Sequence, residues 1–205
     1  MELAARWESL IATLRDYAPA TAASFRPGAT EAAVARCEEA IGVRFPAELR
    51  TWFLLQNGQA DTDTGPAGEL LPLQVFFSLD EIVTEHAALL ELSSEMLDYD
   101  PDYYGSLSAI ANGAPNAGEP TDLFIASYIP ISGYQNIDYF CDTRPGDRHG
   151  SIGWWPYNAG PAAPTEWGSI AELLAHIEHN LTDGPPDGWQ IVVDDGAMYW
   201  ESTGP

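Results

Sequence analysis

Three aspartates at alternate positions, Asp98, Asp100 and Asp102, have the spacing of the first ligands in a calcium-binding loop. The rest of that loop pattern is missing. Gly105 does not stand where the sharp turn is needed, and Ala109 occupies the position of the bidentate glutamate. We therefore interpret these aspartates as a solvated acidic segment and expect no calcium site there.

A second set of metal-ligating residue types, Glu172, His176 and His179, would share part of one face of a helix. Zinc takes three or four ligands in a closed geometry, and this helix offers only two histidines three residues apart and a more distant carboxylate. A histidine near the C-terminal end of a helix is also favoured by the helix dipole. We expect a structural role for these residues, with no metal and no cofactor.

Nucleophilic catalysis finds little support in the motifs. There is no G-x-S-x-G nucleophile elbow, and neither Cys37 nor Cys141 lies in a known catalytic pattern. The chain has no lysine, which excludes a P-loop, and it has no dinucleotide-binding fingerprint. A catalytic triad can still form from residues that are distant in sequence, so an orphan hydrolase remains as the least favoured alternative. Such a hydrolase would need a pocket that holds a histidine or cysteine with a perturbed pKa. We expect a protein that is not an enzyme.

Tyrosines and acids alternate in one segment of the chain. Tyr99, Tyr103 and Tyr104 stand beside Asp100 and Asp102. Tyrosine offers a large amphipathic contact area at low entropic cost, and such side chains concentrate at protein interfaces. Neighbouring carboxylates would suit a basic partner. We predict that these five residues bind a partner protein; the alternative is that the rings pin the segment to its own domain.

The charge distribution points to the same class of partner. The net charge is −23, and all eight basic residues are arginines, six of them within the first fifty positions. Residues 51–143 hold fifteen acids and no base, and residues 151–205 hold eight acids and no base. Such a field repels nucleic acid, and it would speed the capture of a basic partner by roughly ten- to a thousandfold at low salt. A surface that serves solubility alone is the other interpretation.

Local signals predict a run of helices in the first third of the chain. Apolar residues at helical spacing indicate a helix over 2–18 that Pro19 ends. Thr30 is a suitable N-cap for a helix over 31–41, and Gly42 supplies a left-handed stop. Val34, Cys37 and Ile41 would face the core, whereas Arg36, Glu38 and Glu39 would stay in water. Pro46 would be the first residue of the next helix, which buries Leu49, Trp52 and Phe53 and ends at Asn57-Gly58.

The remainder alternates between strands and helices. Capping boxes at Ser78 and Ser169 would open two helices, the first running to about residue 92 or beyond. Asp195-Gly196 would form the turn of a C-terminal hairpin. Trp154 and Trp155 would point to opposite faces of one strand. The predicted strands cover residues 70–77, 123–131, 137–142, 150–157, 189–193 and 197–200.

Several of these motifs, taken in order, resemble the Smi/Knr family of the SUKH superfamily. They are the acidic helix that ends in Ile41-Gly42-Val43, the corner Phe45-Pro46-x-x-Leu49, the Asn57-Gly58-Gln59 that follows the aromatics, and a strand ending in Asp142 before a Pro-Gly turn. The residues of this chain that match the family pattern in structural roles are Trp7, Gly28, Glu38, Gly42, Pro46, Leu49, Trp52, Gly58, Asp142, Pro145, Gly146 and Gly150.

The resemblance implies an α+β fold in a single domain, with a mostly antiparallel sheet packed against several helices. It covers residues 1–181, apart from a segment at about 91–121 without a counterpart, and we expect residues 182–205 to form a hairpin extension packed on the same domain. For a bacterial member the resemblance implies a cytoplasmic immunity protein that sequesters a toxin domain, here one with a basic surface. The alternative is a regulator or scaffold of the Smi/Knr type with no toxin. Two buried, reduced cysteines and the lack of a membrane span or secretory signal agree with the cytoplasm.

Overall fold

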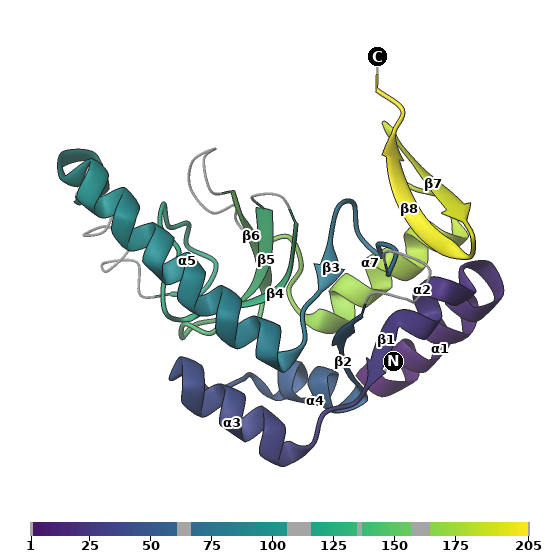
Figure 1. Ribbon diagram of the computed structural model, residues 1–205, viewed down its shortest axis with the longest axis horizontal. Helices are drawn as coiled ribbons and strands as arrows, with labels where there is room; N and C mark the ends of the chain where they lie inside the picture. The colour runs from purple at the N-terminus through teal and green to yellow at the C-terminus, as the bar shows by residue number, and fades with distance from the viewer. Residues whose placement is uncertain (1, 61–66, 106–115, 135–136, 157–164, 205) are drawn as a thin grey trace.

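A computed structural model describes residues 2–60, 67–105, 116–134, 137–156 and 165–204. Helices come first along the chain, then an antiparallel sheet, a further helix and a C-terminal hairpin, which confirms the predicted single α+β domain (Figure 1). The elements are α1 Leu3–Tyr17, α2 Pro19–Ser24, β1 Phe25–Pro27, α3 Glu31–Ile41, α4 Ala47–Leu55, β2 Gln56–Gln59, β3 Val75–Phe76, α5 Leu79–Tyr99, β4 Tyr128–Tyr134, β5 Ile137–Asp142, β6 Ile152–Pro156, α7 Ile170–Thr182, β7 Trp189–Asp194 and β8 Ala197–Ser202.

The corner between α3 and α4 follows the local signals closely. The Thr30 hydroxyl accepts the Ala33 N–H at 3.2 Å, and Gly42 is left-handed with a φ of 72°. Pro46 is extended and lies just before α4, so this helix begins one residue later than predicted. The predicted exposure of Glu38 is wrong: its carboxylate is buried and accepts the backbone N–H of Phe45 at 2.9 Å. This bond ties the end of α3 to the start of α4.

Where the sequence predicted only the end of a helix, Gln56–Gln59 forms β2. This strand pairs antiparallel with β1, with Phe25 opposite Gln59 and Pro27 opposite Gln56. The pairing joins segments about thirty residues apart, and local propensity carries no signal for it.

The main sheet has the order β3-β4-β5-β6 and is antiparallel throughout. The strand predicted over 70–77 is mostly a turn, because Leu73 adopts a φ of 56° and only Val75–Phe76 pairs with β4. The strand predicted over 123–131 begins at Tyr128 and continues to Tyr134, because its register with β5 extends to the pair Tyr134–Ile137. Strands β5 and β6 lie within two residues of their predicted bounds.

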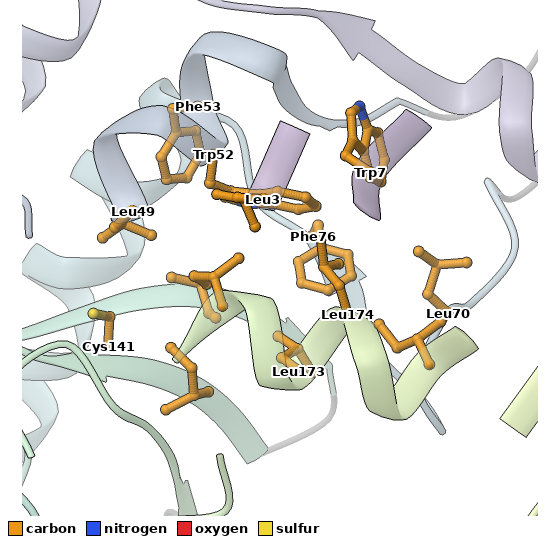
Figure 2. Close-up of a cluster of buried hydrophobic side chains, with 14 of the residues drawn as sticks. Leu3, Trp7, Leu49, Trp52, Phe53, Leu70, Phe76, Cys141, Leu173 and Leu174 are labelled. Carbon is orange, nitrogen blue, oxygen red and sulfur yellow. The ribbon is translucent and has the colours of Figure 1, made fainter. Parts of the chain in front are cut away.

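Both faces of this sheet are buried. One face, with Ile129, Ile131, Cys141 and Ile152, packs into the large core formed by α1, α3, α4, α7 and the start of α5. Figure 2 shows part of this core, where residues of α1, α4 and α7 surround Phe76. The opposite face carries a smaller cluster: Leu89, Phe124, Tyr128, Phe140 and Trp155. Both cysteines are buried free thiols.

The tryptophan pair in β6 divides between the two sides as predicted. Trp155 is fully buried, while Trp154 is partly exposed and donates its indole N–H to Glu166 at 2.9 Å. Ser169 caps α7 by accepting the Glu172 N–H at 3.2 Å. In the predicted capping box the Glu172 carboxylate would accept the N–H of Ser169. It accepts instead the N–H of the preceding residue, Gly168, at 2.7 Å.

The C-terminal hairpin forms as predicted. Asp195 and Gly196 have φ values of 48° and 78°, the left-handed pair that a type I′ turn requires. The hairpin packs against α2 through β8, and it lies at the opposite end of the molecule from the tip of α5 (Figure 1).

Candidate interaction surface

Helix α5 is the longest helix in the described part of the chain, and its two halves have different surroundings. Ser78 and Glu81 form the predicted capping box at its start, with Ser78 N–H donating to Glu81 at 2.6 Å. Its buried stripe is Leu79, Ile82, His86, Leu89 and Ser93. After Ser93 the helix has no further buried residue and projects away from the sheet to Tyr99 (Figure 1).

The five residues predicted to bind a partner lie together at this projecting end. Asp100 caps α5, and its carboxylate accepts the Tyr103 N–H at 3.0 Å, which starts a further helical turn over 101–105. The rings of Tyr103 and Tyr104 contact edge to face, with centroids 5.0 Å apart. Tyr99 is 90 % exposed and Tyr103 57 %. We call Tyr99, Asp100, Asp102, Tyr103 and Tyr104 the acidic tyrosine tip.

The exposed fraction of the Tyr99 ring bears on the alternative that the tyrosines pin this segment to its own domain. A ring that is 90 % exposed does not pin the segment to its own domain. Asp98 belongs to α5 itself, and Asp100 already holds a backbone N–H, so the alternate aspartates are not arranged as a loop around an ion. The part of the predicted insert at 106–115 lies outside the described residues.

A second polar cluster is buried between the sheet and the loop after it. The Arg144 guanidinium donates to Asp142 through Nε at 3.1 Å and through Nη2 at 2.7 Å. Nη2 also reaches the Glu119 carbonyl at 2.6 Å and the Tyr128 hydroxyl at 3.1 Å. Asp142 further accepts the Gly118 N–H at 2.9 Å. The sequence placed Asp142 at the end of a strand but did not predict its buried bonds, because Gly118 comes from a distant segment and the Arg144 side chain folds back over the strand end.

This cluster has the character of a structural network. Burial raises the pKa of the Tyr128 hydroxyl to about 12, against the effect of its bond with Thr121 and of the Arg144 charge. The hollow between Tyr128, Asp142 and Arg144 has a volume of about 10 Å³, which is at most the room of one water molecule. A substrate does not fit there, and Asp142 is shielded from any partner.

The sequence model of the SMI1/KNR4 family (SUKH-1) matches residues 28–178, which is more than half of the chain. The chain belongs to the SMI1/KNR4 family. The predicted resemblance is thereby confirmed. No curated protein matches the chain. The matched span contains the α3–α4 corner, the acidic tyrosine tip and the Asp142 cluster, while α1 and the β7–β8 hairpin lie outside it.

Most arginines of this SUKH-1 chain are engaged by carboxylates. Arg6 bonds Glu178 at 2.9 Å, Arg26 bonds Glu81 at 3.3 Å, and Arg44 and Arg50 reach Glu38 at 3.2 and 3.1 Å. Arg50 also pairs with Glu31. These arginines therefore neutralise carboxylates of the same chain. The tip, in contrast, has acids without any base within residues 51–143.

The thiols and imidazoles of this SUKH-1 fold are not arranged as nucleophiles. Cys37 borders a groove between α3 and α5, but burial, together with the charge of Asp80, raises its pKa to about 12. Burial likewise raises the pKa of Cys141 and lowers the pKa of His86, whose Nε2 lies 3.0 Å from the Ala126 carbonyl. A nucleophilic cysteine requires the opposite shift.

The remaining candidate, the histidines of α7, serves local contacts. His176 lies 3.0 Å from the Asn180 amide and against the Trp167 ring, and His179 pairs with Asp183 at 2.9 Å. Within the described residues, no three histidine, cysteine or carboxylate side chains come close enough to hold a metal ion. In the same part of the chain, every helix is too short or too polar to cross a bilayer.

Proposed function

We propose that this SUKH-1 protein is a non-enzymatic immunity protein, which binds and sequesters a toxin domain with a basic surface. The observation that carries the proposal is the acidic tyrosine tip, in which Tyr99, Asp102 and Tyr103 are exposed at the end of a helix whose other end is anchored in the core. Membership of the SMI1/KNR4 family supports a binding role in general. The two buried free thiols suit a reducing compartment, and we place the complex in the cytoplasm.

Two physical effects would act in sequence. The acids of the tip and the net charge of −23 would steer a basic partner toward the protein and raise the association rate. Tyr99 and Tyr103 would then lose their exposed area to the partner and slow dissociation, as buried aromatic anchors do. Salt would weaken the first effect much more than the second.

The test is a pull-down from the native cell lysate with the whole protein as bait, at low and at high salt, followed by mass spectrometry. We expect one basic protein to be retained at low salt and reduced at high salt. The double variant Tyr103→Ala/Tyr104→Ala should weaken its binding by at least tenfold, about the loss of one anchor residue. Tyr17→Ala is the matched control, because Tyr17 is 45 % exposed on α1, far from the tip.

A loss of less than about twofold in the double variant would reject the tip as the interface, since an anchor costs more than that. A retained partner that is not a toxin would favour the second function, a regulator or scaffold of the same family. Genes beside this one separate the two functions independently, because an immunity protein is encoded next to its toxin.

A further inference from the structure

The two outer edges of the C-terminal hairpin have different surroundings. Along β8, the Met198 carbonyl accepts the Glu69 N–H at 2.7 Å, and the Met198 N–H donates to the Thr21 hydroxyl at 2.8 Å. At the turn, the Gly196 carbonyl accepts the Ala20 N–H at 2.8 Å. The edge of β8 is therefore fastened to the body. In the described ranges of the chain, no strand pairs with the outer edge of β7.

The register identifies the backbone groups on that open edge. Asp194 and Ala197 flank a two-residue turn, so they form a hydrogen-bonded pair, and the bonded pairs recur at every second residue. Val192 and Gln190 therefore bond to β8. The N–H and C=O groups of Ile191 and Val193 point the other way, which leaves two donors and two acceptors aligned along the outer edge of β7.

This edge lacks the features that usually keep strand edges from pairing. The β7–β8 register runs from Trp189–Ser202 to Asp194–Ala197 without a bulge, and the strand contains neither lysine nor proline. Val193 is 37 % exposed, and Ile191 and Val192 are partly exposed. The six residues of β7 can therefore pair with a further strand along this edge.

Charge distinguishes the two strands that could pair with the β7 edge, one from a second copy of this chain and one from a basic partner. A second copy would bring another net charge of −23 to the same edge, and residues 151–205 contain no base to offset it. Exposed acids stand at both ends of the edge, with Asp187 before β7 and Asp194 and Asp195 at its end. Repulsion between the acids of two copies thus disfavours self-pairing, and attraction between these acids and basic side chains favours a cationic strand.

We propose that the outer edge of β7 binds an extended segment of a partner protein by strand addition. The segment has β-branched residues at its centre, next to Ile191 and Val193, and basic residues at both ends, next to Asp187 and Asp195. This surface lies outside the residues matched by the SUKH-1 family and at the opposite end of the molecule from the acidic tyrosine tip. It is therefore independent of the function proposed for the tip.

The probe is a blocked synthetic peptide with the sequence Arg-Thr-Val-Thr-Val-Arg, titrated into the whole protein. Its control has the same sequence with N-methyl groups on both valines and both threonines, which removes the central donors from both edges of the peptide strand. We expect saturating peptide to slow hydrogen exchange at the Ile191 and Val193 amides by at least tenfold, because these amides gain carbonyl partners. The methylated peptide should leave both amides unchanged.

Two variants separate backbone pairing from side-chain contact. Val193→Pro removes an outward N–H while the β7–β8 ladder stays intact, and it should weaken peptide binding at least tenfold. Val193→Thr keeps the N–H with a similar shape and should change binding less than about threefold. The double variant Asp187→Asn/Asp195→Asn, in which asparagine still suits the turn, should cost about two- to fivefold at low salt and nothing at about 1 M salt.

Several results would overturn the proposal. One is equal binding of the methylated peptide, and another is protection confined to amides outside β7. No binding at roughly 1 mM peptide would also reject it, since even weak strand addition is detectable there. A dimer of the free chain that Val193→Pro abolishes would assign the edge to a second copy instead. If Val193→Pro fails to fold by circular dichroism, the pair of peptides decides alone.

Discussion

The guanidinium of Arg144 and the carboxylate of Asp142 form a two-point ion pair, although their side chains are only 6 % and 3 % exposed. Nε lies 3.1 Å from Oδ1, and Nη2 lies 2.7 Å from Oδ2. The Arg144 guanidinium carbon also lies 5.2 Å from the centre of the Tyr128 ring. A buried pair of this kind adds little against an apolar replacement, but breaking it is costly.

Asp142→Asn removes the negative half of this pair and leaves the buried Arg144 charge without its paired carboxylate. We expect the free energy of unfolding to fall by about 3 kcal/mol, which denaturant titration measures. Asp147→Asn is the matched control on the exposed side of the same turn and should change stability by less than about 0.5 kcal/mol. A loss below about 1 kcal/mol in Asp142→Asn would contradict the structural role of the pair.

Glu38 and Glu39 are adjacent in α3 but differ in burial, which makes them a natural pair for comparison. Glu38 accepts the Phe45 N–H and bonds two arginines, whereas Glu39 is exposed. Glu38→Gln should lower the free energy of unfolding by about 2 kcal/mol, because buried charge-assisted bonds are replaced by weaker neutral ones. Glu39→Gln should cost less than about 0.5 kcal/mol. Equal effects in chemical denaturation would mean that Glu38 does not hold the corner.

Two glycines with nearly the same backbone conformation should respond differently to alanine. Gly42 and Gly58 have φ values of 72° and 76°. A Cβ at Gly42 would meet no atom within 4 Å, whereas a Cβ at Gly58 would lie 2.7 Å from the Phe77 carbonyl oxygen. Gly42→Ala should therefore cost only the left-handed penalty of about 1 kcal/mol.

Gly58→Ala carries the same left-handed penalty, and its Cβ also clashes with the Phe77 backbone just before α5. We expect a loss of about 4 kcal/mol or a failure to fold, measured by thermal or denaturant unfolding. If both alanine variants lost the same stability, the close approach of Gly58 to Phe77 would not constrain the fold.

Acidification should destabilise the protein through His86. Burial lowers the pKa of this imidazole in the folded state, so the unfolded state, with a pKa of about 6.5, binds more protons. The stabilisation is present above about pH 6.5 and is lost as the pH falls toward the folded-state pKa. Between pH 7.5 and 5.5 the free energy of unfolding should therefore fall.

The variant His86→Gln isolates this contribution, because glutamine can still donate to the Ala126 carbonyl but does not titrate. Unfolding free energies measured across this pH range should fall less steeply in the variant than in the parent. Parallel curves would show that other groups, such as His176, whose pKa burial also lowers, carry the pH dependence.

The sequence predicted those features whose causes are local. Thr30 and Gly42 fix the bounds of α3 by side-chain and backbone preference alone, and Asp195-Gly196 fixes the hairpin turn in the same way. The tip could be found because its tyrosines and aspartates are neighbours in the chain. Whether they bind a partner stays a prediction, since exposure alone names none.

The features that the sequence missed depend on contacts between distant segments. Glu38 looked like a solvated residue because its partner, the Phe45 N–H, comes into position only when the chain turns after α3. Strand β2 needs β1, and Asp142 needs Gly118. The prediction placed the end of α5 too early, because its last turns carry few apolar residues and only Met96, among the described residues there, packs against an apolar cluster.

The position of Ser93, the last buried residue of α5, has a consequence for how this protein can evolve. Beyond it Met96 still packs against the smaller apolar cluster, but substitutions at the exposed positions of these turns change the surface at almost no cost to folding. Mutations can accumulate at these exposed positions, while the buried residues of the chain stay under constraint. Under the proposed role of the tip, this separation would let the binding surface change with its partner while the fold is kept.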